Sequence, residues 1–349
     1  MAYRIAVDAM GGDHAPEEIV KGVIDAMESD KSIEAILVGD EDAIKKELDK
    51  YQAKRGIEIV HTDQWVGMDE SPKKALESKP RASINLAARL VNDNLADALL
   101  SAGNTGATVL AAAQNLPIIP GIERTALAAI YPTAKFVKGS HGFALMLDVG
   151  ATIKCTPKQL VHFAFMGNYY VSHILGIPQP RVALLNIGEE ATKGGEVLTK
   201  TYEYLQAAEG IHFIGNVEGK DIPKGAADVI VTEGFVGNVV LKLLEGVADV
   251  VKETGKYAFK KKLTWKLGMV MLSEGVKRLK IKTDYSEYGG APVLGFKKLV
   301  IKSHGRSNAK AISNAMQVAV RSVKEDVCSH IGESIAEFNA RHRLDFIEI

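Results

Sequence analysis

Residues 226–246 of the chain read AADVIVTEGFVGNVVLKLLEG. An apolar run from Val229 to Val231 ends in a glycine turn, and the spacing predicts an amphipathic helix that begins near Asn238. In a parallel sheet, this order of strand, turn and helix places free backbone N–H groups and the positive end of a helix at the carboxyl edge, where α/β proteins bind ligands. The residues that follow Asn238, VVLK, include no acid that would repel an anion. The stretch therefore predicts a parallel sheet with a phosphate-type site at Gly234, Gly237 and Asn238.

The same order of strand, turn and helix recurs along the chain. Short apolar strands are expected at residues 3–9, 34–38, 97–101, 143–149, 181–187, 211–214 and 299–301, and helices at 16–27, 41–51, 84–91, 108–114, 158–173 and 195–208. The strands are continuously apolar rather than alternating, which indicates burial on both faces and a mainly parallel sheet flanked by helices. No linker rich in Pro, Gly or Ser divides the chain, so residues 1–349 are predicted to form a single doubly wound α/β catalytic domain.

Charge and cysteine content exclude several classes of protein. The 43 basic and 43 acidic residues cancel, so no nucleic acid partner is expected for the molecule as a whole. The two cysteines, Cys155 and Cys328, form no CxxC pair, which argues against a disulfide scaffold, a zinc site or a redox motif. The amino terminus is unlike a signal peptide, and no apolar run of about 18 residues could span a membrane. We expect a cytoplasmic protein that is soluble or peripherally bound to a membrane.

One segment differs in composition from the rest of the chain. Residues 259–282 carry eight Lys or Arg against one acid, Glu274, within a predicted basic amphipathic helical segment at about 250–283. This pattern suits contact with an anionic membrane surface. The alternative is a helical hairpin whose apolar stripe packs on the core or on a second subunit. The residues predicted to contact a membrane are Leu263, Trp265, Leu267, Val270 and Met271.

The first loop that could carry chemistry follows the first strand and contains Asp8, Asp13 and His14. These side chains could position a substrate or accept a proton. Alternatively, the glycines between them only form a turn, and the two aspartates hold loop amides. Glu17 and Glu18 complement the dipole of the next helix, so the start of that helix is predicted to be a poor phosphate site.

A second glycine turn joins a strand to a helix whose first turn lacks acids. Its residues are Gly103, Asn104, Thr105 and Gly106. Glycines allow a ligand to approach the backbone closely, which makes this turn a second candidate anion site. The alternative is a tight turn in which Asn104 or Thr105 caps the helix.

Two further loops contain cations. Lys193 follows a buried strand, where it could neutralise a phosphate or an oxyanion, or simply pair with Glu189 and Glu190. After the short strand at 299–301, His304 could carry a proton and Arg306 could bind an anion. Equally, His304 could be a structural histidine.

The loop at residues 148–157 has a structural explanation. Thr156, Pro157 and Gln159 fit the N-cap, N1 and N3 positions of a helix. Cys155 is not expected to be a nucleophile, because no histidine at a catalytic spacing accompanies it. The Walker A, GxGxxG, HExxH and GxSxG motifs are all missing, so the sequence signals no nucleotide, dinucleotide, zinc or serine chemistry.

Several stretches together carry a family resemblance. They are AVDAMGGDHAP (6–16), SAGNTGA (101–107), LLNIGEEATKG (184–194), DVIVTEGFVGN (228–238) and DYSEYGGAPVLG (284–295) with SHGRS (303–307). In this order they resemble the bacterial phosphate acyltransferases of phospholipid synthesis, the PlsX family, over nearly the whole chain. Family members usually have Asp where this chain has Glu233, and Asn where it has Thr152. The second departure weakens any ligand role for position 152.

The resemblance implies a fold similar to isocitrate and isopropylmalate dehydrogenases and to phosphate acetyltransferase, without a dinucleotide. No other cofactor and no metal is predicted. The implied enzyme transfers a long acyl group from acyl carrier protein to inorganic phosphate and supplies acyl phosphate to a glycerol-phosphate acyltransferase. The resemblance also implies a homodimer bound peripherally to the inner face of the cell membrane.

Direct attack of phosphate on the thioester is the predicted mechanism, because the sequence offers no nucleophile. We assign Asn238 and Lys193 to the oxyanion and His304 to proton management. Phosphate is assigned to both glycine turns, at residues 103–106 and 234–238, with Lys193 and Arg306 as cations. Two alternatives stay open: a phosphate acetyltransferase-like enzyme that uses a coenzyme A thioester, and a non-catalytic membrane-associated scaffold.

Overall fold

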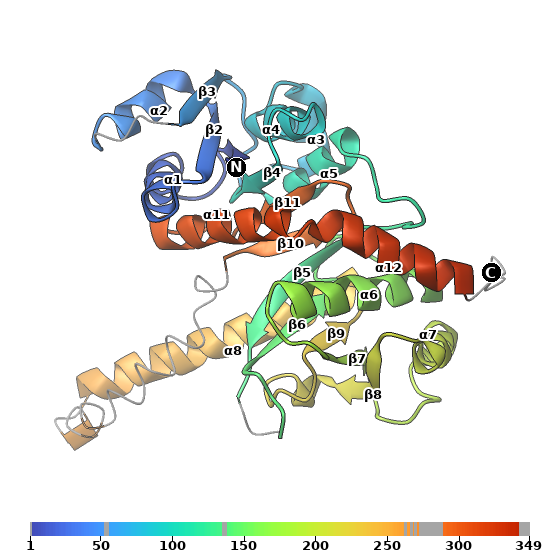
Figure 1. Ribbon diagram of the computed structural model, residues 1–349. Helices are drawn as coiled ribbons and strands as arrows, with labels where there is room; N and C mark the ends of the chain where they lie inside the picture. The colour runs from blue at the N-terminus through green and yellow to red at the C-terminus, as the bar shows by residue number, and fades with distance from the viewer. Residues whose placement is uncertain are drawn as a thin grey trace.

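The computed structural model describes residues 2–51, 56–134, 138–261, 264–265, 268, 271 and 289–341 (Figure 1). The elements up to the middle of the chain are β1 (Tyr3–Asp8), α1 (Glu17–Ser29), β2 (Ile33–Gly39), α2 (Glu41–Leu48), β3 (Ile57–His61), α3 (Pro72–Ser78), α4 (Ser83–Asn92), β4 (Ala98–Ser101), α5 (Thr105–Asn115), β5 (Ala126–Pro132) and β6 (Phe143–Leu147). They are followed by α6 (Pro157–His173), β7 (Arg181–Asn186), α7 (Gly195–Ala207), β8 (His212–Glu218), β9 (Val229–Val231), α8 (Gly234–Lys261), β10 (Ala291–Leu294), β11 (Leu299–Lys302), α11 (Ala309–Lys324) and α12 (Val327–Arg341).

The described strands form one eleven-stranded sheet in the order β3-β2-β1-β4-β11-β10-β5-β6-β9-β7-β8. The strands from β3 to β11 are mutually parallel, and so are those from β6 to β8. Between the two groups, β10 is antiparallel to β11 and β5, and β5 is antiparallel to β6. The mainly parallel sheet that the sequence predicts is therefore confirmed, but β1, β4 and β11 point in the direction opposite to β6, β9 and β7.

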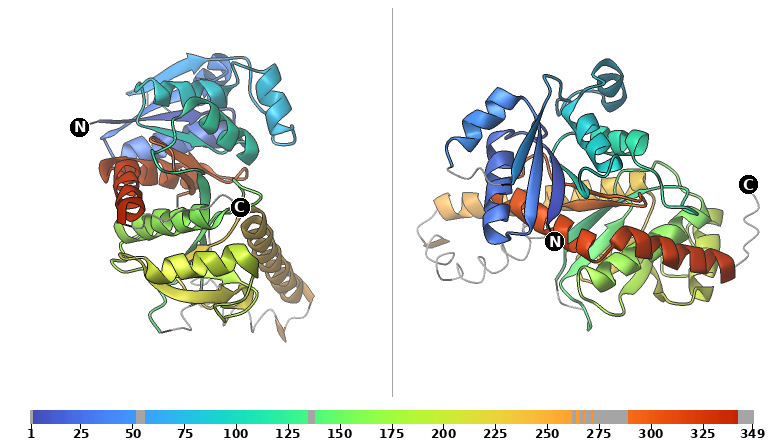
Figure 2. Two further views of the ribbon diagram at one scale, coloured as in Figure 1. Left: turned by 90° about the vertical axis from the view of Figure 1, so that its right-hand side faces the viewer. Right: turned by 45° about the horizontal axis from the view of Figure 1, so that its top comes forward.

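Helices cover both faces of the sheet (Figure 2). On one face, α1 and α11 pack on β1, β2, β4 and β11, while α6, α7 and α12 pack on β5 to β9. On the other face, α4, α5 and α8 share a single apolar cluster that extends from Ile36 on β2 to Leu185 on β7. This shared cluster places α4, α5 and α8 on the same side of the sheet.

Each strand predicted from an apolar run exists in the structure, whereas β3, β5 and β10 were not predicted. The start of α8 differs from the prediction: the helix begins at Gly234, not near Asn238. Gly234 and Gly237 lie in its first turn. A side chain at either position would overlap the backbone of Thr152 or Asp148, which explains why both residues are glycine. The two glycines therefore allow a helix to pack closely against a neighbouring loop, instead of forming the turn before the helix.

The distal part of α8 extends away from the body of the molecule (Figure 1). Near the start of the helix, Leu241 and Leu244 pack on the shared apolar cluster. Val239, Leu243 and Val247 follow each other at four-residue spacing on the outer side, and each is more than half exposed. Within the described residues, no helix combines the length and apolar character needed to cross a bilayer.

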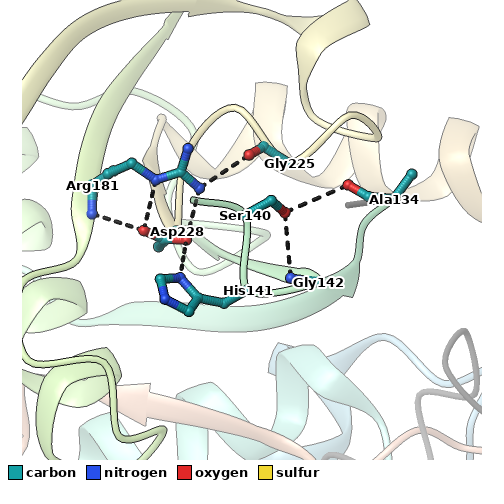
Figure 3. Close-up of polar contacts among 7 residues, drawn as sticks. All are labelled: Ala134, Ser140, His141, Gly142, Arg181, Gly225 and Asp228. Carbon is teal, nitrogen blue, oxygen red and sulfur yellow. Dashed lines mark hydrogen bonds and ion pairs between the residues drawn. The ribbon is translucent and has the colours of Figure 1, made fainter. Parts of the chain in front are cut away.

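A buried ion pair fixes the amino ends of β7 and β9 (Figure 3). The guanidinium of Arg181 donates to both oxygens of Asp228, at 3.0 and 2.9 Å, and the Arg181 amide donates to the same carboxylate at 2.9 Å. His141 Nδ1 lies 3.0 Å from Asp228 Oδ1. Burial alone would raise the pKa of Asp228, but Arg181 and His141 together lower this pKa below its ordinary value. Arg181 and His141 therefore compensate the charge of the buried Asp228 carboxylate, and this cluster does not require a bound ligand.

Candidate functional site

Two candidate anion sites lie at the carboxyl ends of strands in the two halves of the sheet. The first, called the β11 site, is formed at the carboxyl ends of β1, β4 and β11, and the second, called the α8 site, at the carboxyl ends of β6, β9 and β7. These two groups of strands run in opposite directions, but the register through β10 and β5 places Leu147, the last residue of β6, level with Ile301 of β11. The carboxyl ends of the two groups therefore lie close to the same level of the sheet. The first turns of α8 link the two sites, because the helix begins at the α8 site and its Lys242 lies near Lys302 of the β11 site.

The α8 site is organised around Asp148, which directly follows β6 and is fully buried. Its carboxylate accepts hydrogen bonds from the amides of Leu127, Gly150, Ala151 and Thr152 at 2.7 to 3.1 Å. The Thr152 hydroxyl donates a further bond to it at 2.9 Å. Burial raises the pKa of Asp148, although these donors oppose the shift. The loop that faces the start of α8 is thus wrapped around one carboxylate.

Thr152 also connects this loop to α8. Its hydroxyl oxygen accepts a hydrogen bond from the Gly234 amide at 3.0 Å and lies 3.2 Å from Cys155 Sγ. Burial raises the pKa of Cys155 to about 11, so its thiol stays protonated at neutral pH. Position 152 therefore supports the helix start, and Cys155 does not have the thiolate that a nucleophile needs.

The start of α8 offers backbone donors to an anion. In the part of the chain that the structure describes, the amides of Phe235 and Val236 have no hydrogen-bond acceptor. Asn238, one turn further on, is exposed and lies over Gly150, where an added Cβ would be 3.9 Å from Asn238 Cγ. The half-buried Glu233 precedes the helix, so an acid lies closer to this start than the sequence prediction assumed. The site still has free amides and an adjacent carboxamide.

Lys193 is exposed in the loop after β7, the strand next to β9. The loop is fixed by its backbone: Asn186 Nδ2 donates to the Lys193 carbonyl at 3.0 Å, and the Lys193 amide donates to the Glu190 carbonyl at 3.1 Å. Neither Glu189 nor Glu190, both described, forms an ion pair with Lys193. The structure places Lys193 and Asn238 at the same edge of the sheet.

The β11 site is a row of polar side chains. Asp8, Ser101 and Lys302 occupy the last positions of three neighbouring parallel strands, in register with each other. Side chains two residues earlier on each strand belong to the apolar cluster beneath α4, α5 and α8. Because side chains alternate along a strand, the row points to that same face. The apolar face of the sheet therefore ends in an acid, a hydroxyl and a cation.

Asp8 is buried and fixes the loops around it. Its oxygens accept hydrogen bonds from Ser83 Oγ at the start of α4, at 2.6 Å, and from Ser101 Oγ, at 2.7 Å. A third bond comes from the Met10 amide, and burial still raises the pKa of the carboxyl group above its ordinary value. These contacts agree with the alternative interpretation of Asp8 as a residue that holds loops.

The start of α5 lies above this row. Asn104 caps the helix by accepting from the Ala107 amide at 3.1 Å, and the Gly103 amide donates to Ser101 Oγ at 3.0 Å. The amides of Thr105 and Gly106 have no acceptor among the described residues. Both functions considered for this turn are thus compatible: Asn104 caps the helix, and two amides stay available for an anion.

Cations gather at the end of β11. Lys302 is 6 % exposed, and its ammonium donates to the Ser303 carbonyl. Burial lowers the pKa of Lys302 to about 8, with Asp8 opposing the shift and Lys242 of α8 adding to it. The pKa of His304 is also lowered, by partial desolvation first and by Lys242 and Lys302 among the neighbouring charges.

Arg306, Asp13 and His14 lie together on the other side of this edge. They line an open cavity of about 510 Å³, whose wall also includes Glu17, Glu18 and Glu47. The Asp13 amide donates to the Gly305 carbonyl at 2.8 Å, which joins the loop after β1 to the loop after β11. The acids that surround Arg306 make this cavity poorly suited to an anion, as predicted for the start of α1.

The predicted membrane contacts are only partly described. Trp265 is 45 % exposed and Met271 is 84 % exposed. Leu263, Leu267 and Val270 lie outside the described residues.

Sequence reasoning missed Ser83, Ser101, Lys302 and Lys242 as site residues. The one local signal was a lysine that continues the apolar run of Leu, Val and Ile in β11, because lysine is rarely fully buried. The convergence of these residues depends on strand register and on the path of α8, which single motifs do not reveal.

Comparison with known proteins agrees with this architecture. Residues 3–330 match the family model described as fatty acid synthesis protein. The phosphate acyltransferase of Thermoanaerobacter pseudethanolicus is 44 % identical over 332 residues, which cover 95 % of this chain and 97 % of the relative. The phosphate acyltransferase of Heliobacterium modesticaldum is 47 % identical over 334 residues, with 95 % and 97 % covered.

Solved structures show the same fold at low identity. A phosphotransacetylase from Streptococcus pyogenes superposes with a TM-score of 0.60 at 18 % identity, over 93 % of this chain and 94 % of that one. A branched-chain phosphotransacylase from Enterococcus faecalis superposes with a TM-score of 0.53 at 16 % identity, over 91 % of this chain and 99 % of that one. The predicted likeness to the phosphate acetyltransferase fold is confirmed. By its family model and its relatives, the chain belongs to the fatty acid synthesis protein family of phosphate acyltransferases, as its motifs predict.

Proposed function

We propose that this enzyme transfers a long-chain acyl group from acyl carrier protein to inorganic phosphate. A phosphate oxygen attacks the thioester carbonyl, the carbon–sulfur bond breaks, and the carrier thiolate leaves and takes up a proton. The product, acyl phosphate, serves as the acyl donor for a glycerol-phosphate acyltransferase. Phosphate is partly deprotonated at neutral pH, so the reaction needs positioning and charge stabilisation more than a strong base.

The observation that carries this proposal is the α8 site. It combines the free amides of Phe235 and Val236 with the side chains of Asn238 and Lys193. Such donors suit the oxyanion that develops on the thioester carbonyl. The protonated thiol of Cys155 nearby supports direct transfer to phosphate, without an acyl-enzyme intermediate.

The decisive assay measures acyl phosphate by phosphorus NMR after the purified protein is mixed with acyl carrier protein thioester and phosphate. We expect phosphate-dependent release of the carrier thiol and a matching acyl phosphate signal. A parallel reaction with the coenzyme A thioester tests the alternative substrate. Faster release from coenzyme A would favour the acetyltransferase-like function, and no acyl phosphate from either donor would favour a scaffold.

The exposed outer side of α8 supports two further parts of the proposal. Val239, Leu243 and Val247 form an apolar stripe that a second copy of the chain would cover, giving a homodimer. Further along, exposed Trp265 and Met271 with the surrounding lysines suit the anionic inner face of the cell membrane. The enzyme would then be cytoplasmic and peripherally bound.

Tryptophan fluorescence tests the membrane contact. The chain contains two tryptophans, so a Trp65→Phe variant reports on Trp265 alone. We expect a blue shift of its emission with anionic vesicles, and a smaller one with vesicles of neutral lipid. An unchanged spectrum with both would assign Trp265 to a protein contact.

A further inference from the structure

Lys302 is a buried ammonium with unused hydrogen-bond donors. An ammonium has three N–H donors, and among the described residues Lys302 has one acceptor, the Ser303 carbonyl. The side chain is 6 % exposed, so water can accept few hydrogen bonds from the other N–H donors. A buried charge without full pairing is costly, and an anionic ligand would supply the missing acceptors.

The nearby acid does not fill this role. The oxygens of Asp8 already accept from the hydroxyls of Ser83 and Ser101 and from the Met10 amide. Asp8 is close enough to Lys302 to favour its charged form, yet no direct ion pair joins these two described residues. Asp8 therefore moderates the charge of Lys302 but leaves its donors free.

Further positive charge faces Lys302 from other elements. Lys242 comes from α8, while His304, which is close enough for Lys302 to lower its pKa, comes from the loop after β11. The acids that oppose them are Asp8, Asp13 and Glu245. Lys242 disfavours the charged form of Lys302, so the fold brings two ammonium groups near each other. Such repulsion is relieved when an anion lies between the groups.

The start of α5 adds neutral donors beside the same row. Ser101 is in register with Lys302, but its hydroxyl donates to Asp8 at 2.7 Å, so the available donors of this helix start are backbone amides. The unpaired amides of Thr105 and Gly106 open the same helix. The first turn of α5 contains no acid. Amides at a helix start and a nearby ammonium are the donor set that phosphoryl groups prefer.

We propose that Lys302, together with the amides of Thr105 and Gly106, binds a phosphoryl group at the carboxyl end of β11. This inference deepens the proposed function and rests on it for the identity of the ligand. Two substrates of that reaction carry a phosphoryl group: inorganic phosphate, and the phosphodiester through which the carrier protein holds its thiol arm. Binding at the β11 site would leave the α8 site to the oxyanion.

Calorimetric titration with inorganic phosphate tests the site without any acyl donor. In Lys302→Met we expect the dissociation constant for phosphate to rise about ten- to a hundred-fold, the usual effect of losing a hydrogen bond to a charged group. Lys297→Met is the matched control, because Lys297 is exposed at the opposite end of β11. Its dissociation constant should stay at the wild-type value.

Steady-state kinetics separate the two sources of the phosphoryl group. If inorganic phosphate is the ligand, Lys302→Met raises the KM for phosphate and leaves the KM for the acyl carrier protein thioester unchanged. If the phosphodiester is the ligand, the KM for the carrier thioester rises instead and calorimetry shows no change. Normal values of both KM and of the calorimetric constant would overturn the proposal, even if acyl transfer is confirmed. Conversely, phosphate binding that depends on Lys302 without acyl transfer would overturn the proposed function alone.

A second variant protects the test against misfolding of Lys302→Met. Lys242→Gln removes an ammonium that is 59 % exposed on α8, so the fold is not at risk. We expect it to weaken binding of the phosphoryl group by up to about five-fold, as for an exposed charge pair.

The pH dependence of binding to the wild-type protein gives a third readout, because the pKa of Lys302 is about 8. Binding should weaken above that pH, and it should weaken less in Lys302→Arg. Unchanged binding in Lys242→Gln together with a flat pH profile would also overturn the proposal.

Discussion

The hydroxyl of Thr152 accepts a hydrogen bond from the amide of Gly234 at 3.0 Å, which joins the loop after β6 to the first residue of α8. The same hydroxyl donates to the buried Asp148 carboxylate at 2.9 Å. One side chain therefore satisfies a helix-start donor and a buried acceptor together. The position of the α8 site depends on this contact.

Replacing the hydroxyl tests that dependence. In Thr152→Val, Asp148 loses a donor and Gly234 loses its acceptor, so we expect the free energy of unfolding to fall by about 1–3 kcal/mol. Turnover should fall as well, because the start of α8 is no longer held. Thr152→Ser keeps the hydroxyl and should retain most of the stability and most of the turnover. Urea unfolding and acyl transfer rates provide the measurement, and equal stability of the Val and Ser variants would contradict this role.

Two glycines of α8 should respond in opposite directions to alanine. A Cβ at Gly237 would overlap the Asp148 carbonyl, whereas one at Gly246 has no neighbour within 4 Å. We expect Gly237→Ala to destabilise the protein by about 1–3 kcal/mol through overpacking. Gly246→Ala should stabilise it by up to about 1 kcal/mol through helix propensity. Thermal unfolding of the pair checks this, and a tolerated Gly237→Ala would mean that the helix does not pack as closely as described.

Lys193 should affect catalysis without affecting folding. Its side chain is exposed, so Lys193→Ala should leave the unfolding transition in place. If its ammonium stabilises the oxyanion, turnover should fall about a hundred-fold or more. Lys200→Ala on α7 is a suitable control, since Lys200 pairs only with exposed Glu196 among the described residues. Wild-type kinetics in Lys193→Ala would remove this residue from the mechanism.

The pair formed by Arg181 and Asp228 should contribute to stability alone. Arg181→Met leaves a fully buried carboxylate unpaired, so we expect a loss of about 3–5 kcal/mol. Adding Asp228→Asn should restore part of it, because the charge is removed as well. His141→Gln should cost less, since half of the His141 side chain reaches solvent. Chemical denaturation measures all three, and equal losses in the single and double variants would argue against a charge effect.

His162 predicts a loss of stability in mild acid. Burial lowers the pKa of His162 to about 4, whereas its ordinary value is 6.5. Below pH 6.5 the unfolded chain therefore binds a proton that the folded chain does not, so stability falls as the pH falls toward 4. Between pH 7 and 5 the loss should be on the order of 2 kcal/mol. His162→Gln should unfold with a flatter pH dependence, and an unchanged slope would assign the acid lability to other groups.

The sequence revealed most of the fold but not the direction of the sheet. Apolar runs such as Val229 to Val231 identify buried strands, because continuous burial needs continuous apolar residues. The strand β5 is rich in alanine, and β10 contains Pro292, so neither has a strong strand pattern. These two strands produce the reversal between the halves of the sheet.

The candidate sites were predictable to different degrees. Asn238 and Lys193 were predicted because glycine-rich turns after apolar strands leave local patterns. The row formed by Asp8, Ser101 and Lys302 was not found, because it depends on the register of three strands distant in sequence. Thr152 was set aside because it departs from the family pattern. Its hydrogen bonds explain how a threonine can serve at that position.

The helix α8 is anchored at its start and projects beyond the body of the molecule (Figure 1). Its first three turns are held by Gly237, Leu241 and Leu244, and with 28 residues the helix is about 42 Å long. Lys242 lies within these anchored turns, so the packing that holds the start of α8 also sets the position of the cation near Lys302.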